Sequence, residues 1–214
     1  PFFERFVGLW EARKDAPDFK NGMEAVKWMD GKETSTPHGA CSDRFARLAY
    51  QAAGVKPKSY LNQNIEVITT NFRAGKLDAA VIWEPTASKI VHAGLAKRVA
   101  SGEDFDAHDG AFLIMLNDLM KQRPDVVRGW LEAELDAQLF LADPKNASEV
   151  AELAQKQTEQ IDKKVLWTAM YGEYPKSQGG GPVKLELDFV INDKVRKLIG
   201  DATAFLHSLP NKPA

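Results

Sequence analysis

Cysteine is almost missing from this chain, because Cys41 is the single cysteine among its 214 residues. One cysteine excludes a disulfide within the chain and a zinc site built from cysteines. An excess of charge of either sign is missing too, since 28 basic and 30 acidic residues leave a net charge of −2. We therefore expect neither nucleic acid nor an anionic membrane surface as a partner.

Long apolar runs are also absent. No stretch has the length of a membrane-spanning helix, and the segment from Pro1 onward lacks the basic and apolar regions of a signal peptide. A mature exported protein would also lack the signal-peptide regions, so their absence says little about export. With 214 residues the chain can bury a sizeable core, in one large domain or two small ones.

The most informative stretch present is GKLDAAVIWEP, from Gly75 to Pro85. Ala79 to Trp83 is a short continuous apolar run, which is typical of a strand covered by helices on both faces. Pro85 suits the first position of a following helix. Trp83 and Glu84 are therefore expected at the carboxyl end of a strand, where open α/β sheets bind ligands. Taken alone, the pattern favours a tryptophan that fills the core and a glutamate that caps the helix.

A second junction of this kind lies upstream. Residues 32–36 have strand-like, β-branched character, and a loop of small residues at 37–40 follows them. A helix then begins near Cys41. Backbone N–H groups at such a helix start can bind an anion without any lysine or arginine. The same pattern also fits a simple helix cap at Ser42 or Asp43.

A cysteine nucleophile and a metal site are two other kinds of site that the sequence could form, and each has a simpler interpretation. A helix N-terminus can lower the pKa of a thiol, so a nucleophilic Cys41 is conceivable, and His38 is the histidine nearest to it in sequence. A small residue that lines an anion-binding loop is the simpler interpretation. The acidic and histidine residues at 104–109 offer four potential metal ligands but lack the glycine and final glutamate of an EF-hand loop. We therefore expect no metal site there.

The remaining glycine, proline and periodicity signals predict a coarse secondary structure. Residues 31 to about 104 alternate between strand and helix patterns, as in a parallel sheet. The stretch 65–72 fits a helix or a strand, since its β-branched content cannot decide. A buried strand is expected over 111–116, and Pro124 is expected to open a helix. The apolar inner face of that helix would comprise Val127, Trp130, Leu131 and Leu135.

Mainly helical structure is expected toward the C-terminus. Helices are predicted over 147–156 and 162–170, and another is predicted to start near Asn192. Alternating apolar residues between Val183 and Phe189 indicate an extended segment before that last helix. Residues 210–213 read as a tail.

Four segments, taken in this order, carry a resemblance to a known family. They are TPHGAC at 36–41, AGKLDAAVIWEP at 74–85, DGAFL at 109–113 and KQRPDVVRGWL at 121–131. Together they resemble the nitrate, sulfonate and taurine type of ABC-transporter substrate-binding protein. The resemblance covers roughly residues 29–145, and the segment that ends in Trp-Glu-Pro is its most specific part.

This resemblance implies a fold and an organisation. The fold would be α/β, of the type II periplasmic-binding-protein kind, with a ligand cleft between two lobes. Residues 31–104 would form lobe two, while 1–30 and 105–214 would form the rest of lobe one with C-terminal helices. Relatives carry further N-terminal strands and helices, so we expect lobe one to lack that part here. The resemblance also favours a helix over 65–72 and a strand at 59–61.

The function that the resemblance implies is solute capture for an ABC importer. The protein would be a periplasmic or lipid-anchored monomer outside the cytoplasmic membrane, without enzyme activity or cofactor. Its partners would be an ABC permease and a small anionic or zwitterionic solute such as taurine, another sulfonate or nitrate. Two other classes stay open: an enzyme of the same fold related to thiamine-pyrimidine synthesis, and the ligand-sensing domain of a transcriptional regulator.

The two junctions and the resemblance together predict the ligand contacts. Donors at the helix start would bind the anionic group, and His38 would add a donor whose charge depends on pH near neutrality. Trp83 would pack against the organic part of the solute. Glu84 would either receive a ligand amine or anchor the following helix. The predicted ligand-binding residues are His38, Gly39, Ala40, Cys41, Ser42, Asn62, Gln63, Trp83, Glu84 and Asp109.

Overall fold

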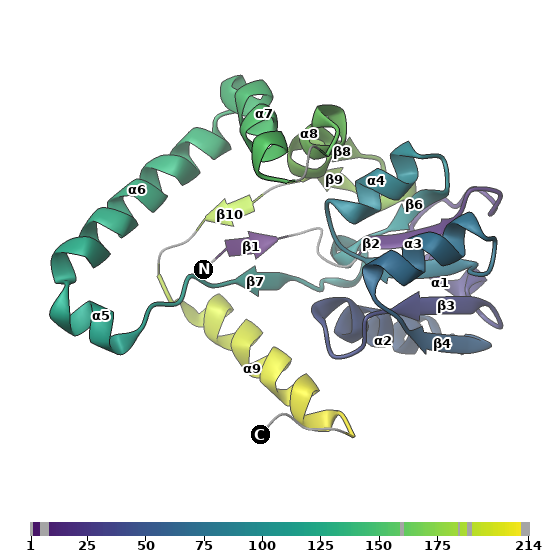
Figure 1. Cartoon of the computed structure of the whole chain (residues 1–214). Helices are drawn as coiled ribbons and strands as arrows, with labels where there is room; N and C mark the ends of the chain where they lie inside the picture. Colours follow the sequence, from purple (N-terminus) through teal and green to yellow (C-terminus); the bar gives the residue numbers. More distant parts are fainter. Residues whose placement is uncertain (1, 5–8, 159–160, 184, 188–189, 211–214) are drawn as a thin grey trace.

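A five-stranded mixed sheet organises one part of the molecule, in the order β4-β3-β5-β2-β6 (Figure 1). The computed structural model describes residues 2–4, 9–158, 161–183, 185–187 and 190–210. The strands are β2 (Leu9–Arg13), β3 (Glu33–Thr36), β4 (Ser59–Asn62), β5 (Ala79–Ile82) and β6 (Ala96–Ala100). Strand β3 pairs in parallel with β4 and β5, whereas β2 runs antiparallel to β5 and β6.

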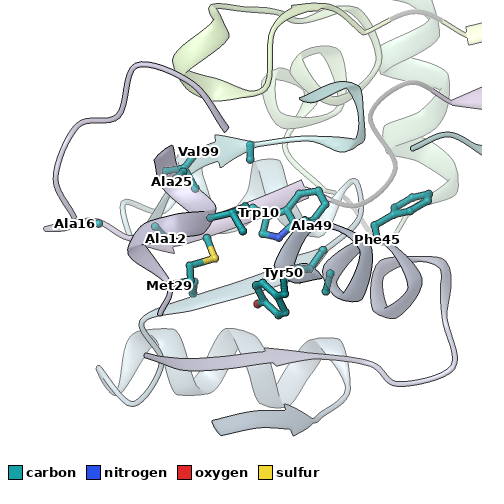
Figure 2. Close-up of a cluster of buried hydrophobic side chains, with 14 of the residues drawn as sticks. Trp10, Ala12, Ala16, Ala25, Met29, Phe45, Ala49, Tyr50 and Val99 are labelled. Carbon is teal, nitrogen blue, oxygen red and sulfur yellow. The ribbon is translucent and has the colours of Figure 1, made fainter. Parts of the chain in front are cut away.

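Helices cover this sheet on both faces. They are α1 (Gly22–Trp28), α2 (Cys41–Ala53), α3 (Ile65–Arg73) and α4 (Thr86–His92). Side chains of α1 and α2 pack around Trp10 on one face, as Figure 2 shows, and α3 and α4 pack over Ala80 and Ile82 on the other. All four residues of β5 are buried. The prediction of a strand covered on both faces is therefore confirmed.

Local signals account for the helix boundaries. Gly54 ends α2 with a left-handed φ of 66°. The stretch 65–72, which fits a helix or a strand in sequence, forms the helix α3. The Asn64 side chain caps this helix, and Ile68 and Phe72, one turn apart, are both buried. Helix α4 begins one residue later than predicted, because Pro85 is its N-cap and Thr86 is its first residue.

A second region contains a smaller antiparallel sheet and most of the remaining helices. Its sheet has the order β10-β1-β7, with β1 (Phe2–Glu4), β7 (Asp109–Ala111) and β10 (Leu185–Leu187). The helices are α5 (Asn117–Gln122), α6 (Pro124–Ala142), α7 (Ala147–Gln157), α8 (Lys163–Tyr171) and α9 (Asp193–Ser208). In Figure 1, α5 and α6 lie on the far side of this sheet from the five-stranded one, while α8 packs against α4.

Short elements complete the chain. The hairpin strands β8 (Glu173–Tyr174) and β9 (Gly181–Pro182) pair with each other. Short 3-10 helices in the described residues are η1 (Gly102–Phe105), η2 (Pro144–Asn146) and η3 (Lys176–Gln178). The predicted extended segment contains β10, although residues 184, 188 and 189 of it lie outside the described residues. Most of the predicted tail at 210–213 lies outside them too.

Two predictions about the second region are wrong. The strand expected over 111–116 stops at Ala111, because Ala111 pairs with Phe2 and the described chain offers no strand opposite residues 112–116. Ile114 and Leu116 are 87% and 78% exposed instead of buried. The helix opened by Pro124 forms as predicted, but its apolar face lies open: Val127 is only half-buried, and Trp130, Leu131 and Leu135 are exposed.

The five-stranded sheet reaches outside the segment predicted to form lobe two. Strand β2 lies between β5 and β6, and α1 packs beside it, although both precede residue 31. The sequence pattern of 31–104 contains the parallel strands β3, β4 and β5 but gives no sign of an inserted antiparallel partner.

Candidate functional site

Three loops meet at one edge of the five-stranded sheet. In the parallel strands β3, β4 and β5, Thr36 pairs with Asn62, and Ser35 pairs with Ala80. The carboxyl ends of these strands therefore lie side by side, which is where open α/β sheets form binding crevices. The Thr36 hydroxyl ties the edge together, because it donates to the Val81 carbonyl at 2.7 Å and bonds the Ser42 hydroxyl at 2.8 Å. We call this edge, with the loops that follow β3, β4 and β5, the crevice edge.

The start of α2 already contains a negative charge. The buried Asp43 carboxylate accepts hydrogen bonds from the Gly39 N–H at 2.9 Å, the Tyr60 hydroxyl at 2.6 Å and Arg47 Nε at 2.7 Å. Burial alone would raise the pKa of Asp43, but these three donors outweigh it and lower the pKa. Asp43 thus uses one of the donors that were predicted to reach a ligand.

Two backbone donors at the helix start remain open. Ala40 is the N-cap of α2 and has no side-chain capping bond. The N–H groups of Ala40 and Cys41 have no hydrogen-bond partner within the described part of the chain. Ser42 is fully buried, and its hydroxyl bonds Thr36 rather than facing the surface. The predicted anion contacts are thereby narrowed to the amides of Ala40 and Cys41.

Cys41 is half-buried at the first position of α2. Burial raises the pKa of its thiol, and the neighbouring Asp109 carboxylate, which accepts a hydrogen bond from the thiol, acts in the same direction, so that together they bring the pKa to about 12. A thiol that stays protonated at neutral pH is a poor nucleophile. Asp109, on β7, is thus the one predicted contact from the second region that reaches the start of α2.

The loop after β3 and the end of β4 hold each other in place. The His38 backbone N–H donates to Asn62 Oδ1 at 2.9 Å, and the His38 ring lies 4.8 Å from the Tyr60 ring. Partial burial lowers the pKa of His38, so its ring is neutral at neutral pH. Gln63 Oε1 accepts from the Ser35 hydroxyl and the Asn71 amide, so the Gln63 oxygen is used internally.

Trp83 and Glu84 follow β5 at the same edge. Both are half-buried, and the peptide bond between Glu84 and Pro85 is cis. The Glu84 carboxylate accepts from the Ser88 N–H at 2.9 Å and the Ser88 hydroxyl at 2.8 Å, and it forms an ion pair with Arg98. Of the two roles predicted for Glu84, the geometry corresponds to the anchor of α4.

The sequence pattern missed a buried charge cluster below Glu84. Arg98 on β6 has a side chain 3% exposed, and its Nε lies 3.6 Å from Oε1 of the fully buried Glu11 on β2. The Tyr174 ring lies 4.0 Å from the guanidinium carbon. The available signal was the presence of Glu11 and Arg98 inside the segments LWEA and AKRVA, which are otherwise apolar apart from Lys97.

Within the described residues, no group of three or more His, Cys, Asp or Glu side chains could hold a metal ion. Asp104 instead accepts from the backbone N–H groups of Ser101 and Gly22. Among the helices in the described part of the chain, none combines the length and the apolar character that crossing a membrane requires.

The chain belongs to the NMT1-like family, whose model matches residues 35–155, more than half of the sequence. No curated protein matches it. The periplasmic aliphatic sulphonate-binding protein SsuA from Escherichia coli has a similar structure, with a TM-score of 0.73 at 17% identity. That match covers 99% of this chain and 65% of SsuA.

Two further structures are similar. The alkanesulfonate-binding protein SsuA from Xanthomonas axonopodis pv. citri, bound to MOPS, gives a TM-score of 0.65 at 16% identity, over 94% of this chain and 63% of that one. The desulfurization enzyme DszB gives a TM-score of 0.67 at 14% identity, and the match covers 96% of this chain and 70% of DszB. The chain thus has the type II periplasmic-binding-protein fold, and it spans slightly less than two thirds of the two sulfonate-binding proteins.

Proposed function

We propose that this chain is the solute-binding component of an ABC importer, which captures a small anionic or zwitterionic organic solute and delivers it to a membrane permease. The observation that carries the proposal is the crevice edge, where open amides at the start of α2 and the indole of Trp83 follow neighbouring parallel strands. Membership of the NMT1-like family supports the same class of function.

The charges at the crevice edge favour a particular kind of solute. Arg47 pairs with Asp43, and Arg98 pairs with Glu84, so both cations are already neutralised. A compact oxyanion would therefore be bound by the Ala40 and Cys41 amides at the positive end of the α2 dipole. A sulfonate, a nitrate or a carboxylate meets this requirement. The two similar SsuA structures, which are described as binding sulfonates, support a sulfonate as the first candidate.

The other parts of the proposed solute follow from two side chains. Trp83 offers an apolar surface to an organic portion. The Asp109 carboxylate beside Cys41 offers an acceptor to an amine. Taurine carries a sulfonate, two methylene groups and an amine, so it is the first solute that we would test. Asn62 and the neutral His38 ring stand at the rim as weaker contacts.

We further propose the organisation and location that this role requires. Lobe two comprises residues 31–104 together with β2 and α1, and lobe one comprises the rest. The solute is held between the lobes, and hinge motion through segments such as β7 closes them. The protein acts in the periplasm or at the outer face of the cytoplasmic membrane, where the permease docks on both lobes.

A binding role without turnover is supported by the state of Cys41. Enzymes that use a cysteine nucleophile depress its pKa, whereas burial and Asp109 raise the pKa of Cys41 to about 12. The similarity to DszB, at 14% identity, concerns the fold. A chemical assay for loss of sulfonate or sulfinate from the bound solute would expose turnover if it occurred.

Isothermal titration calorimetry with a panel of solutes tests the proposal. The panel contains taurine, ethanesulfonate, nitrate, MOPS and bicarbonate, with a neutral sugar as the negative control. We expect saturable binding of at least one sulfonate, and no heat from the sugar. If no member of the panel binds, the assignment of the crevice edge as a solute site is wrong.

A further inference from the structure

The buried cluster beneath the crevice edge has no part in the proposed ligand contacts. Glu11 on β2 and Arg98 on β6 are register partners across an antiparallel pair, so their side chains leave the same face of the sheet. Glu84 enters from the turn between β5 and α4, and Tyr174 enters from β8. We call these four residues the Arg98 cluster.

Arg98 is the centre of this cluster. Its Nη2 forms the ion pair with Glu84 and lies 3.4 Å from the Ser88 hydroxyl. Its Nε lies 3.6 Å from Oε1 of Glu11, and its guanidinium lies against the ring of Tyr174. One side chain thereby joins three segments that lie far apart in the sequence to the turn that carries Trp83.

The balance of charge in the cluster decides which partner Arg98 keeps. Both oxygens of Glu11, and Nε and Nη1 of Arg98, are buried without a hydrogen bond in the described structure. Burial raises the pKa of Glu11 to about 8; Arg98 opposes the rise, and Glu84 adds to it. At neutral pH Glu11 therefore holds its proton, and the charge of Arg98 is matched by Glu84 alone.

We propose that Arg98 is a positioning residue for solute binding: it holds Glu84 against the start of α4 and thereby fixes the turn that presents Trp83. Glu11 acts beneath it as a second acid that competes for the guanidinium once it ionises. This inference rests on the proposed function for its effect on solute, but the placement of Trp83 can be measured without any solute.

A dependence on pH follows from this arrangement. When Glu11 loses its proton, one guanidinium faces two carboxylates, and its hold on Glu84 weakens. Burial raises the pKa of Tyr174 above its ordinary value of 10, so the Tyr174 ring stays neutral through this range. Burial and Asp109 raise the pKa of Cys41 to about 12, and burial lowers the pKa of His38 from its ordinary value, so neither group accounts for a transition near pH 8.

Fluorine NMR of protein labelled with 5-fluorotryptophan measures the turn directly. The Trp83 signal is assigned by its loss in Trp83→Phe. We expect this signal to shift with a midpoint near pH 8 in the wild type and to stay constant in Glu11→Gln, which imitates the protonated acid. In Arg98→Lys, which keeps the charge but loses the planar fork, we expect the signal to be displaced already at neutral pH.

Calorimetry with ethanesulfonate, a member of the solute panel, gives the second readout. We expect wild-type affinity to fall roughly tenfold between about pH 7 and pH 9, the fall to vanish in Glu11→Gln, and Arg98→Lys to bind roughly tenfold more weakly at pH 7. Lys97→Met is the matched control, because Lys97 is the neighbour of Arg98 on β6 and pairs with the exposed Asp18. This control should match the wild type in both readouts.

The two readouts separate the possible failures. If no solute binds while the Trp83 signal behaves as expected, the proposed function fails and the positioning role stands. If solute binds but the Trp83 signal ignores Glu11→Gln and Arg98→Lys, the positioning role is wrong and the proposed function stands. A shift that persists in Glu11→Gln would assign the transition to another group and would overturn the role given to Glu11.

Discussion

Asp43 shows how one side chain can use the chemistry of a helix start. The loop before α2 predicts an anion site from its small residues alone. In the structure the Asp43 carboxylate takes the Gly39 N–H and binds Tyr60 and Arg47 as well. The amides of Ala40 and Cys41 have no partner among the described residues, and we propose that they bind the solute. The anion site at this loop stays a prediction, and the loop offers fewer open donors than its sequence indicates.

Trp83 is expected to contribute strongly to solute affinity. Replacing Trp83 with alanine removes the apolar surface at the crevice edge, so we expect affinity to fall by roughly 10- to 100-fold, with little change in the melting temperature because the indole is only half-buried. Calorimetry checks the prediction. Trp167→Ala, which removes an exposed indole from α8, is the control. Equal losses in both variants would contradict a contact between Trp83 and the solute.

Glu11 should govern how stability depends on pH. The unfolded chain releases this proton near its ordinary value of 4.5, whereas the folded chain holds it to about pH 8. The folded state therefore binds the extra proton between these values. The contribution of the protonated Glu11 to the free energy of unfolding is present in full below about pH 4.5 and declines as the pH rises toward 8.

Replacing Glu11 with glutamine removes that decline. Urea denaturation at several pH values should show the free energy of unfolding of Glu11→Gln exceeding that of the wild type by an amount that grows with pH, on the order of a few kcal/mol at pH 8. Asp106→Asn, at an exposed loop carboxylate, should follow the wild-type curve. A constant difference across the range would show that Glu11 ionises normally in the folded chain.

Secondary structure could be predicted where the signal is local. The apolar run predicted as a strand from Ala79 to Trp83 forms β5 over Ala79–Ile82. The proline predicted to open a helix opens α6, and the glycine predicted to end a helix ends α2. The sequence could not show that Glu11 would meet Arg98, because their pairing joins strands 87 positions apart in the chain. Long-range pairing of this kind leaves no periodic trace in either strand.

Helix α3 is the element whose assignment depended on a cap. Its β-branched residues suit a strand, but Asn64 accepts from the Val67 N–H at 2.9 Å and starts a helix. Asn64→Ala should lower the free energy of unfolding by about 1 kcal/mol, and Asn64→Ser should restore most of the loss. Chemical denaturation measures both. No loss in the alanine variant would mean that the burial of Ile68 and Phe72 sets the helix start without the cap.

The chain as a whole carries a broad apolar surface around α5 and α6. Amphipathic periodicity predicted the helix α6, but periodicity cannot say what covers its apolar face. Residues 112–115, Met120 of α5 and the face of α6 that carries Leu131 line an open pocket of about 440 Å³. Leu139, further along the same helix, is 63% exposed.

An apolar surface of this kind should bind an environment-sensitive hydrophobic dye. We expect the chain of 214 residues to enhance dye fluorescence in the folded state, and Leu139→Lys to reduce the enhancement severalfold without lowering the melting temperature. Lys121→Met, which replaces an exposed charged residue on α5 with an apolar one, should not reduce the dye fluorescence. Equal dye binding by Leu139→Lys would place the bound dye elsewhere.

The crevice edge itself is best tested by one NMR titration. A sulfonate that binds is added to 15N-labelled protein, and the amide signals of Ala40 and Cys41 are followed together with the indole N–H of Trp83. We expect all three signals to move along one binding curve with one dissociation constant, because the start of α2 and Trp83 would contact the same molecule. Movement of the amides without the indole, or of the indole without the amides, would contradict a shared site.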